Sequence, residues 1–267
     1  MRPIITLLSD FGVRDPYVAE MKGVILGICP EAVLVDISHE VEKFNVAVGA
    51  FLLASAVRFF PKGSIHVAVV DPGVGGPRRP LVIEAGCGYL VGPDNGLLAL
   101  AAEREGLRGI YEIKPGRYTL RNISSTFHGR DVFAPAAAYL ARGTPPDMLG
   151  VKVEAYTGVS AFKSLPGRGW AEAVILYVDS FGNIITGLSW RDVDEAGFSS
   201  ASRFKVSAGG RVFEALKAST YSDVAEGKLA LIPYGSHGFM ELAVNRGDAA
   251  ALLKVKAGDK LTVKVTS

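Results

Sequence analysis

Glutamine is absent from this 267-residue chain, and only five asparagines and two cysteines occur. A scarcity of amide side chains is typical of proteins from hot environments, so the composition is thermophile-like. Cys29 and Cys87 lie in separate apolar contexts without metal-ligand spacing. We therefore expect two buried free thiols and no disulfide, which indicates a cytoplasmic protein.

Long apolar runs and basic clusters are also missing. The longest apolar stretch, residues 46–60, is interrupted by a glycine, a serine and an arginine, so it is too short and too mixed to span a bilayer. The net charge is only +2, and no basic run exceeds the pair Arg78-Arg79. We expect neither a membrane nor a nucleic acid as partner. The four histidines are scattered, so no metal site is predicted.

What is present divides into two regions of different character. Residues 1–160 alternate apolar strand and helix patterns, which predicts a layered α/β domain. Residues 164–169 have the composition of a linker. Short β-like segments separated by glycine turns follow, at 173–178, 183–187, 204–206, 211–214, 229–232, 239–244 and 261–265. The second domain, residues 168–267, is therefore expected to be a small C-terminal antiparallel β-barrel. The predicted strands of the first domain are 4–9, 32–37, 65–70, 81–84 and 89–91, the last two forming a hairpin. Its predicted helices are 15–29, 45–59, 95–105 and 132–142, and Asp15, Asn45 and Asn95 are the candidate caps of the first three.

The segment Asp71-Pro-Gly-Val-Gly-Gly-Pro-Arg78 is the strongest local signal. It follows an apolar strand, and an acid after such a strand is how α/β enzymes place a charged group where ligands bind. A phosphate-binding loop is the obvious alternative, but it requires Lys-Ser or Lys-Thr after its glycines. Here Arg79-Pro80 leads into another apolar run. Taken alone, the segment is equally compatible with a plain glycine turn.

Further polar segments end apolar runs along the chain. They are Ser9-Asp-Phe-Gly12, Gly92-Pro-Asp-Asn-Gly96, Phe127-His-Gly-Arg-Asp131, Asp179-Ser-Phe-Gly-Asn183 and Ser236-His-Gly-Phe-Met-Glu-Leu-Ala-Val-Asn245. In this order they closely resemble the S-adenosylmethionine hydrolases that form adenosine and methionine, relatives of fluorinase and chlorinase. The resemblance runs over essentially the whole chain. It implies an α/β domain followed by a β-barrel domain, and a homotrimer with the ligand between one subunit's first domain and a neighbour's second.

The resemblance also implies a catalytic set of Asp71, Arg78 and His128. The fluorinase has tyrosine in place of both Asp71 and His128, and it carries an insertion between Arg79 and Tyr89. These departures favour water over halide as the nucleophile. The leaving group, methionine, is a neutral thioether, so neither a general acid nor a metal nor another cofactor is required. Asp71 and His128 can both accept a proton from water, and the sequence does not decide between them.

Substrate-binding roles follow from the same resemblance. Asp10 suits the ribose diol, because a carboxylate accepts two hydrogen bonds. Phe181 is expected to stack on adenine, Asn183 and backbone groups of Val244 and Arg246 to meet its edge, and Phe44 to line the ribose pocket. The residues expected at the methionine end are Asp15, Asp179 and Ser236. Two departures from the fluorinase, Tyr17 for serine and His237 for arginine, fall at that end.

Three other functions remain open at this point. A halide-dependent adenosyl transferase on the same scaffold is the nearest rival, and Asp71 and His128 argue against it. A non-catalytic binder of adenosine or S-adenosylmethionine needs the binding residues but not a water-activating set. A metal or phosphate hydrolase has the least support, because no ligand cluster is apparent.

Overall fold

The computed structural model describes residues 2–158 and 164–266, and the chain divides into two units, residues 1–159 and 160–267. Each unit has a hydrophobic core of its own. The predicted end of the first domain, residue 160, lies outside the described residues. The segment 164–169, expected to be a linker, instead contains strand β8 (Leu165–Gly167), which pairs with β9 (Trp170–Val178) of the second unit.

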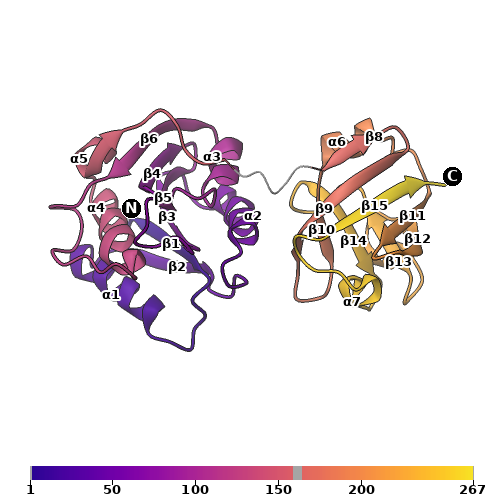
Figure 1. Ribbon diagram of the computed structural model, residues 1–267, viewed down its shortest axis with the longest axis horizontal. Helices are drawn as coiled ribbons and strands as arrows, with labels where there is room; N and C mark the ends of the chain where they lie inside the picture. Colours follow the sequence, from indigo (N-terminus) through magenta and orange to yellow (C-terminus); the bar gives the residue numbers. More distant parts are fainter. Residues whose placement is uncertain (1, 159–163, 267) are drawn as a thin grey trace. The chain divides into compact units, whose positions relative to one another are not determined.

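The first unit is a mixed sheet with helices on both faces (Figure 1). In order of pairing, its strands are β2 (Val33–Ser38), β1 (Ile4–Ser9), β3 (Ser64–Val69), β5 (Gly88–Pro93), β4 (Pro80–Ala85), β6 (Leu107–Ile113) and β7 (Gly150–Lys152). The first four run parallel, and β4 and β5 form the predicted antiparallel hairpin. β3 is buried along its whole length, as a parallel strand covered on both faces should be. β6 and β7 were not predicted.

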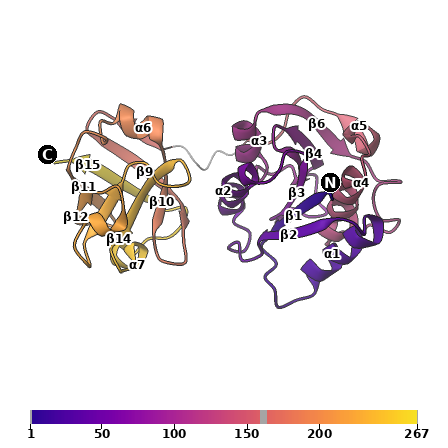
Figure 2. The same cartoon turned by 180° about the vertical axis from the view of Figure 1, so that it is seen from behind.

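The helices sort by sheet face. α1 (Tyr17–Ile28) and α4 (Ala134–Ala141) pack together on one face, and α2 (Val46–Ala56) and α3 (Ala99–Glu105) lie on the other (Figures 1 and 2). A 3-10 turn (Val57–Phe59) follows α2, and a short helix, α5 (Pro146–Leu149), precedes β7.

The helix starts test three sequence predictions. Asn45 caps α2, since its Oδ1 accepts a hydrogen bond from the Val48 N–H at 3.1 Å, as predicted. Asp15 does not cap α1, because that helix begins after Pro16 without any side-chain cap. Asn95 does not open α3 either. It is used in a turn, where its Oδ1 accepts from the Leu97 N–H at 3.1 Å, and the helix starts later.

The second unit is a β-barrel, as predicted. Its strands close a ring in the order β9, β10 (Ile184–Ser189), β14 (Phe239–Val244), β13 (Leu229–Ile232), β12 (Arg211–Lys217), β11 (Arg203–Ala208) and β15 (Lys260–Val265). The barrel is mixed and not wholly antiparallel, because β12 and β13 pair in parallel. The connection between them is a crossover containing a 3-10 turn, Tyr221–Asp223, and not a tight hairpin. Two short helices, α6 (Trp190–Glu195) and α7 (Ala249–Leu253), were not predicted.

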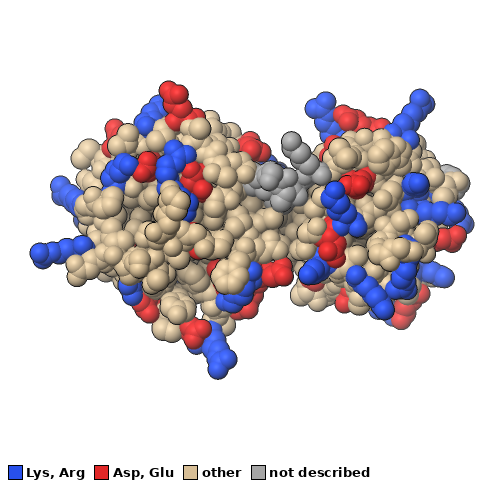
Figure 3. Space-filling view, viewed as in Figure 1, with Lys and Arg blue, Asp and Glu red and all other residues tan. Residues whose placement is uncertain are grey.

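Charges of both signs are mixed over the visible surface of each unit (Figure 3). Cys29 and Cys87 are both buried and unpaired, as the sequence predicted. Within the part of the chain that the structure describes, none of the helices has the length and apolar character needed to cross a membrane.

Candidate functional site

Three polar side chains of the first unit follow the ends of parallel strands. Asp10 comes directly after β1, Asp71 follows β3, and Asn95 follows β5. Neighbouring parallel strands deliver these residues to one edge of the sheet, where α/β proteins bind ligands. The Asn95 Nδ2 donates to the Val70 carbonyl at 2.9 Å, so it fixes the chain immediately before Asp71.

Arg78 links the other two predicted catalytic residues, Asp71 and His128. Its guanidinium binds the Asp71 carboxylate in a bidentate manner, with Nε donating to Oδ1 at 3.0 Å and Nη2 donating to Oδ2. The same Nη2 lies 2.9 Å from Nδ1 of His128. The side chains of Arg78 and Asp71 are 9% and 4% exposed, which strengthens the ion pair because little water screens it. The Phe133 ring lies 5.5 Å from the guanidinium carbon and covers it.

These contacts define the protonation state of His128. A guanidinium only donates hydrogen bonds, so Nδ1 of His128 must accept, and the neutral ring carries its proton on Nε2. Burial lowers the pKa of His128, and the neighbouring Arg78 charge lowers it further, against the opposing effect of Asp71 and Asp131. His128 is therefore held neutral at neutral pH.

A close backbone approach brings the Asp71 loop to His128. Gly75 has φ of +75°, and a Cβ there would lie 2.2 Å from the Ser125 carbonyl oxygen. Only glycine permits this packing, which places the loop against the segment that leads into His128. The chain then forms a π-helix, Gly129–Phe133, a local geometry that occurs frequently at functional sites.

Buried Asp131 organises the segment around His128. It is fully buried, and its Oδ2 accepts from the Ser124 N–H at 2.7 Å. Arg130 donates from Nε to Asp131 Oδ1 at 2.7 Å and from Nη1 to Glu20 Oε2 on α1 at 2.8 Å. These bonds tie the His128 segment to α1 and compensate the buried charge.

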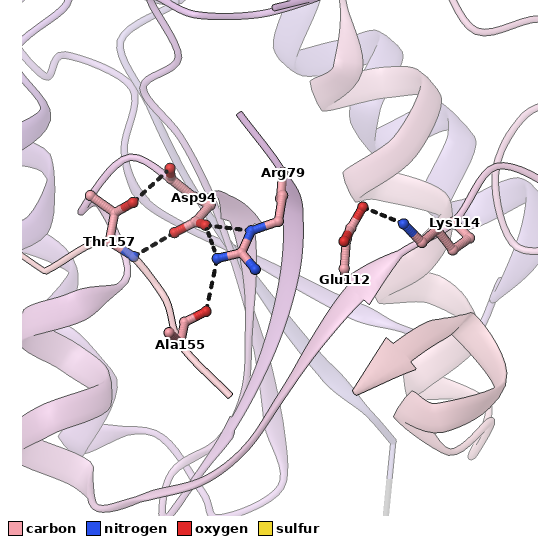
Figure 4. A network of polar contacts seen from close by, with 6 residues as sticks. All are labelled: Arg79, Asp94, Glu112, Lys114, Ala155 and Thr157. Atoms are coloured by element: carbon pink, nitrogen blue, oxygen red, sulfur yellow. Dashed lines mark hydrogen bonds and ion pairs between the residues drawn. The ribbon is translucent and has the colours of Figure 1, made fainter. Parts of the chain in front are cut away.

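A second arginine holds the chain beside Arg78. Figure 4 shows Asp94 between Arg79 and Thr157, and Arg79 Nη2 donates both to Asp94 Oδ2 at 2.6 Å and to the Ala155 carbonyl at 2.8 Å. The Thr157 N–H donates to Asp94 Oδ1 at 2.6 Å. The network therefore fixes the residue after Arg78 and anchors the last described segment of the first unit.

A cavity of about 400 Å³ opens beside the three catalytic candidates. Asp10 and Phe44 meet at its wall, since Asp10 Oδ2 accepts from the Phe44 N–H at 2.9 Å. Phe44 adopts a left-handed backbone with φ of +64°, and its side chain is 70% exposed. Five predicted site residues of the first unit therefore line one cavity, namely Asp10, Asp15, Phe44, Asp71 and His128. The lining also includes residues to which the sequence analysis assigned no role: Phe11, Lys43, Val69, Val74, Thr126, Phe127 and Gly129.

The second unit has a separate cavity of about 620 Å³. Five predicted binding residues line it, namely Asp179, Phe181, Asn183, Val244 and Arg246. Asp179 is occupied by its own loop: Oδ1 accepts from the backbone N–H groups of Phe181 and Asn183, and Oδ2 from Asn183 Nδ2, each at 2.9 Å. Phe181 projects outward and is 76% exposed.

Two site features of the second unit differ from expectation. Ser236 does not line this cavity and lies on an exposed turn, with its Oγ 3.2 Å from His237 Nδ1. Tyr221 does line the cavity although the sequence did not single it out, because it stands alone in a polar stretch without a motif. Among residues 2–158 and 164–266, no cluster of three or more histidine, cysteine or acidic side chains could hold a metal ion.

Comparison with known proteins follows the same two-part division. The model of the SAM hydroxide adenosyltransferase N-terminal domain matches residues 5–150, and that of the C-terminal domain matches residues 173–262. The chain belongs to the SAM hydroxide adenosyltransferase family. The resemblance found in the sequence motifs is thereby confirmed.

Relatives of this family member extend over nearly its full length. Proteins named (R)-S-adenosyl-L-methionine hydrolase from Salinispora tropica and Thermus thermophilus are 39% and 40% identical, covering 98% and 97% of this chain and 97% and 98% of their own. A fluorinase from Nocardia brasiliensis is more distant, at 27% identity over 99% of this chain and 97% of its own. A crystal structure of an uncharacterized conserved protein from Thermotoga maritima superposes with a TM-score of 0.90 at 37% identity, covering 97% of this chain and 99% of that one.

Proposed function

We propose that the protein hydrolyses S-adenosylmethionine to adenosine and methionine by attack of water on ribose C5′. The observation that carries the proposal is the contact of Arg78 with both Asp71 and His128 beside the first cavity. A protein that only binds a nucleoside has no need for this buried charged set. The relatives at 39% and 40% identity are named (R)-S-adenosyl-L-methionine hydrolase, which supports the R epimer at sulfur as the substrate.

The leaving group of this reaction does not have to be protonated. An oxygen–C5′ bond forms as the C5′–S bond breaks, and the bonding electron pair returns to sulfur, which loses its positive charge. Methionine leaves as a neutral thioether, and the attacking water gives up one proton. The protein therefore has to orient the water in line with the C5′–S bond and accept that proton.

Asp71 is the proton acceptor in this proposal. Neutral His128 has its Nδ1 lone pair engaged by Arg78 and its proton on Nε2, so it donates to the water oxygen. Each Asp71 oxygen keeps a second lone pair beyond its bond to Arg78 and can accept from the water. Arg78 fixes the carboxylate and stabilises developing hydroxide character.

Substrate binding is assigned to both cavities. In the first, Asp10 would accept from the ribose hydroxyls, Phe44 would line the ribose pocket, and Asp15 would lie toward methionine. In the second, Phe181 would stack on adenine, and Asn183 and the backbone of Val244 and Arg246 would bind its edge. Asp179 and Ser236 complete the proposed methionine contacts. The bonds that Asp179 makes within its loop favour a supporting part in presenting Phe181 and Asn183.

We further propose that the protein is a homotrimer whose site combines the first unit of one subunit with the second unit of a neighbour. Mixing an Arg78→Ala protein with an Asn183→Ala protein tests this arrangement, because mixed trimers would contain some intact sites. Recovery of activity on subunit exchange is expected. Activity that stays at the level of the single variants, or a monomer by light scattering, would refute it.

The first experiment is chromatography of products from purified protein incubated with the separate R and S epimers of S-adenosylmethionine. Hydrolysis in water enriched in oxygen-18 should place the label in the 5′-hydroxyl of adenosine, without added halide. An Asp71→Asn protein is the matched control and should form no product. A 5′-halogenated nucleoside that appears only with chloride or fluoride would assign the protein to the transferases instead, and tight adenosine binding without turnover would make it a binder.

A further inference from the structure

Glu241 is a buried carboxylate that the proposed reaction does not use. It lies on β14 and is 5% exposed. Its Oε1 accepts a hydrogen bond from the Tyr221 hydroxyl at 2.7 Å. Burial raises the pKa of Glu241, the bond from Tyr221 opposes this rise, and the nearby charge of Asp179 adds to it. Burying a carboxylate is costly, so a specific use for this one is expected.

Tyr221 is held at both ends. Its backbone begins the 3-10 turn, which the Asp223 carboxylate closes by accepting from the N–H groups of Ser219 at 2.8 Å and Thr220 at 3.0 Å. Its hydroxyl is fixed by Glu241. Between these anchors the ring lines the second cavity together with Phe181 and Asn183. A ring ordered in advance loses little further conformational entropy when a flat ligand binds.

The carboxylate itself is confined by a glycine. A Cβ on Gly235 would lie 3.2 Å from both Cβ and Oε2 of Glu241, and 2.6 Å from the Phe239 carbonyl oxygen. The turn therefore packs directly on the carboxylate, which restricts its rotamer and hence the position of the Tyr221 hydroxyl.

We propose that Glu241 is a positioning residue for the adenine subsite: through its hydrogen bond it holds the Tyr221 ring as a second aromatic wall of the cavity that Phe181 also lines. This inference rests on the proposed function, which places adenine in that cavity. Glu241 contacts Tyr221 and is not among the residues that line the cavity, so its effect should fall on nucleoside affinity and leave the chemical step unchanged.

Calorimetric titration of the full chain with adenosine tests the proposal. Tyr221→Phe removes only the hydroxyl, and Glu241→Met removes the acceptor at similar volume. Each should weaken adenosine binding by about fivefold, in keeping with the loss of one hydrogen bond. The double variant should be no weaker than either single one, because both remove the same bond. Glu241→Gln keeps an acceptor oxygen and should restore most of the affinity.

Turnover provides a readout that a merely structural role would not move. In these variants KM for S-adenosylmethionine should rise while kcat stays within about twofold. Glu214→Gln, at an exposed position on β12, is the matched control and should change neither. A lower melting temperature with unchanged adenosine affinity, or additive losses in the double variant, would overturn the positioning role alone. A wild-type protein that binds neither adenosine nor S-adenosylmethionine would overturn the proposed function, and this inference with it.

Discussion

The two cavities of this protein use carboxylates in opposite ways. In the first unit, both oxygens of Asp71 bind the guanidinium of Arg78, which also contacts His128. In the second unit, Asp179 accepts three hydrogen bonds from its own loop, two at Oδ1 and one at Oδ2. A carboxylate at the wall of a cavity is therefore not necessarily a reacting group. The proposed function accordingly assigns the chemical step to the first cavity and the presentation of an aromatic ring and an amide to the second.

The sharpest way to break this comparison is Arg78→Ala. Loss of the cation frees Asp71 and His128 from their shared partner, so kcat should fall by about 10³-fold, as expected when an electrostatic stabiliser is removed. Adenosine affinity should change by less than about threefold, because Arg78 belongs to the reacting end. Single-turnover kinetics and adenosine titration measure the two effects. Arg108→Ala, at an exposed site on β6, is the control, and a matching loss of adenosine binding would make Arg78 a substrate contact instead.

Lowering the pH should destabilise the first unit more than the second. His66 on β3 is fully buried, its Nδ1 lies 2.9 Å from Thr6 Oγ1, and burial lowers its pKa to about 4. Between pH 6.5 and about 4 the unfolded chain binds a proton at this residue and the native chain does not, so stability falls as pH falls. From pH 7 to pH 5 the first unit should lose about 2 kcal/mol.

The two units can be followed separately, because both tryptophans, Trp170 and Trp190, belong to the second. Urea unfolding followed by far-ultraviolet circular dichroism should shift to lower urea at pH 5, and the tryptophan fluorescence transition should shift less. His66→Asn should reduce the pH dependence of the circular dichroism transition, whereas His237→Asn in the exposed turn should leave it unchanged. Equal shifts of both transitions in the wild type would contradict the assignment to His66.

Asp10→Ala tests the binding part of the first cavity. Removing a charged acceptor for the ribose diol should weaken adenosine binding by about 10- to 100-fold. It also releases the Phe44 N–H, which Asp10 holds at 2.9 Å. Asp10→Asn keeps one acceptor and should lose less affinity. Unchanged affinity in Asp10→Ala, measured by calorimetry, would remove this residue from the ribose site.

A smaller effect on affinity is expected at the aromatic ring of the second cavity. Phe181→Ala should weaken adenosine binding by about tenfold, within the range of base stacking on an aromatic ring, and leave the folded stability unchanged because the ring is 76% exposed. Phe59→Ala is the matched control, since Phe59 is 79% exposed on the first unit. Equal affinities for the two variants would argue that adenine binds elsewhere.

Much of the fold could be predicted because apolar periodicity is local. β1, β13 and β14 fall where the sequence predicts them or within a residue, and Asn45 caps its helix. β6, β7, α6 and α7 were missed. The helices α6 and α7 have only 6 and 5 residues, too few for a period of 3.6 to emerge. The parallel pairing of β12 with β13 was missed because it depends on a crossover and not on either strand.

The sequence by itself determined the family, the two-part organisation and many of the residues around both cavities, because these lie in short motifs at the ends of apolar runs. Only the tertiary structure decided which partners each residue contacts there. Arg78 meets His128 across 50 positions of chain, through a glycine contact that no local pattern encodes. Tyr221, in the connection between β12 and β13, and Glu241, on β14, likewise meet only in the folded barrel. The motifs identify the side chains, and packing decides which of them contact one another.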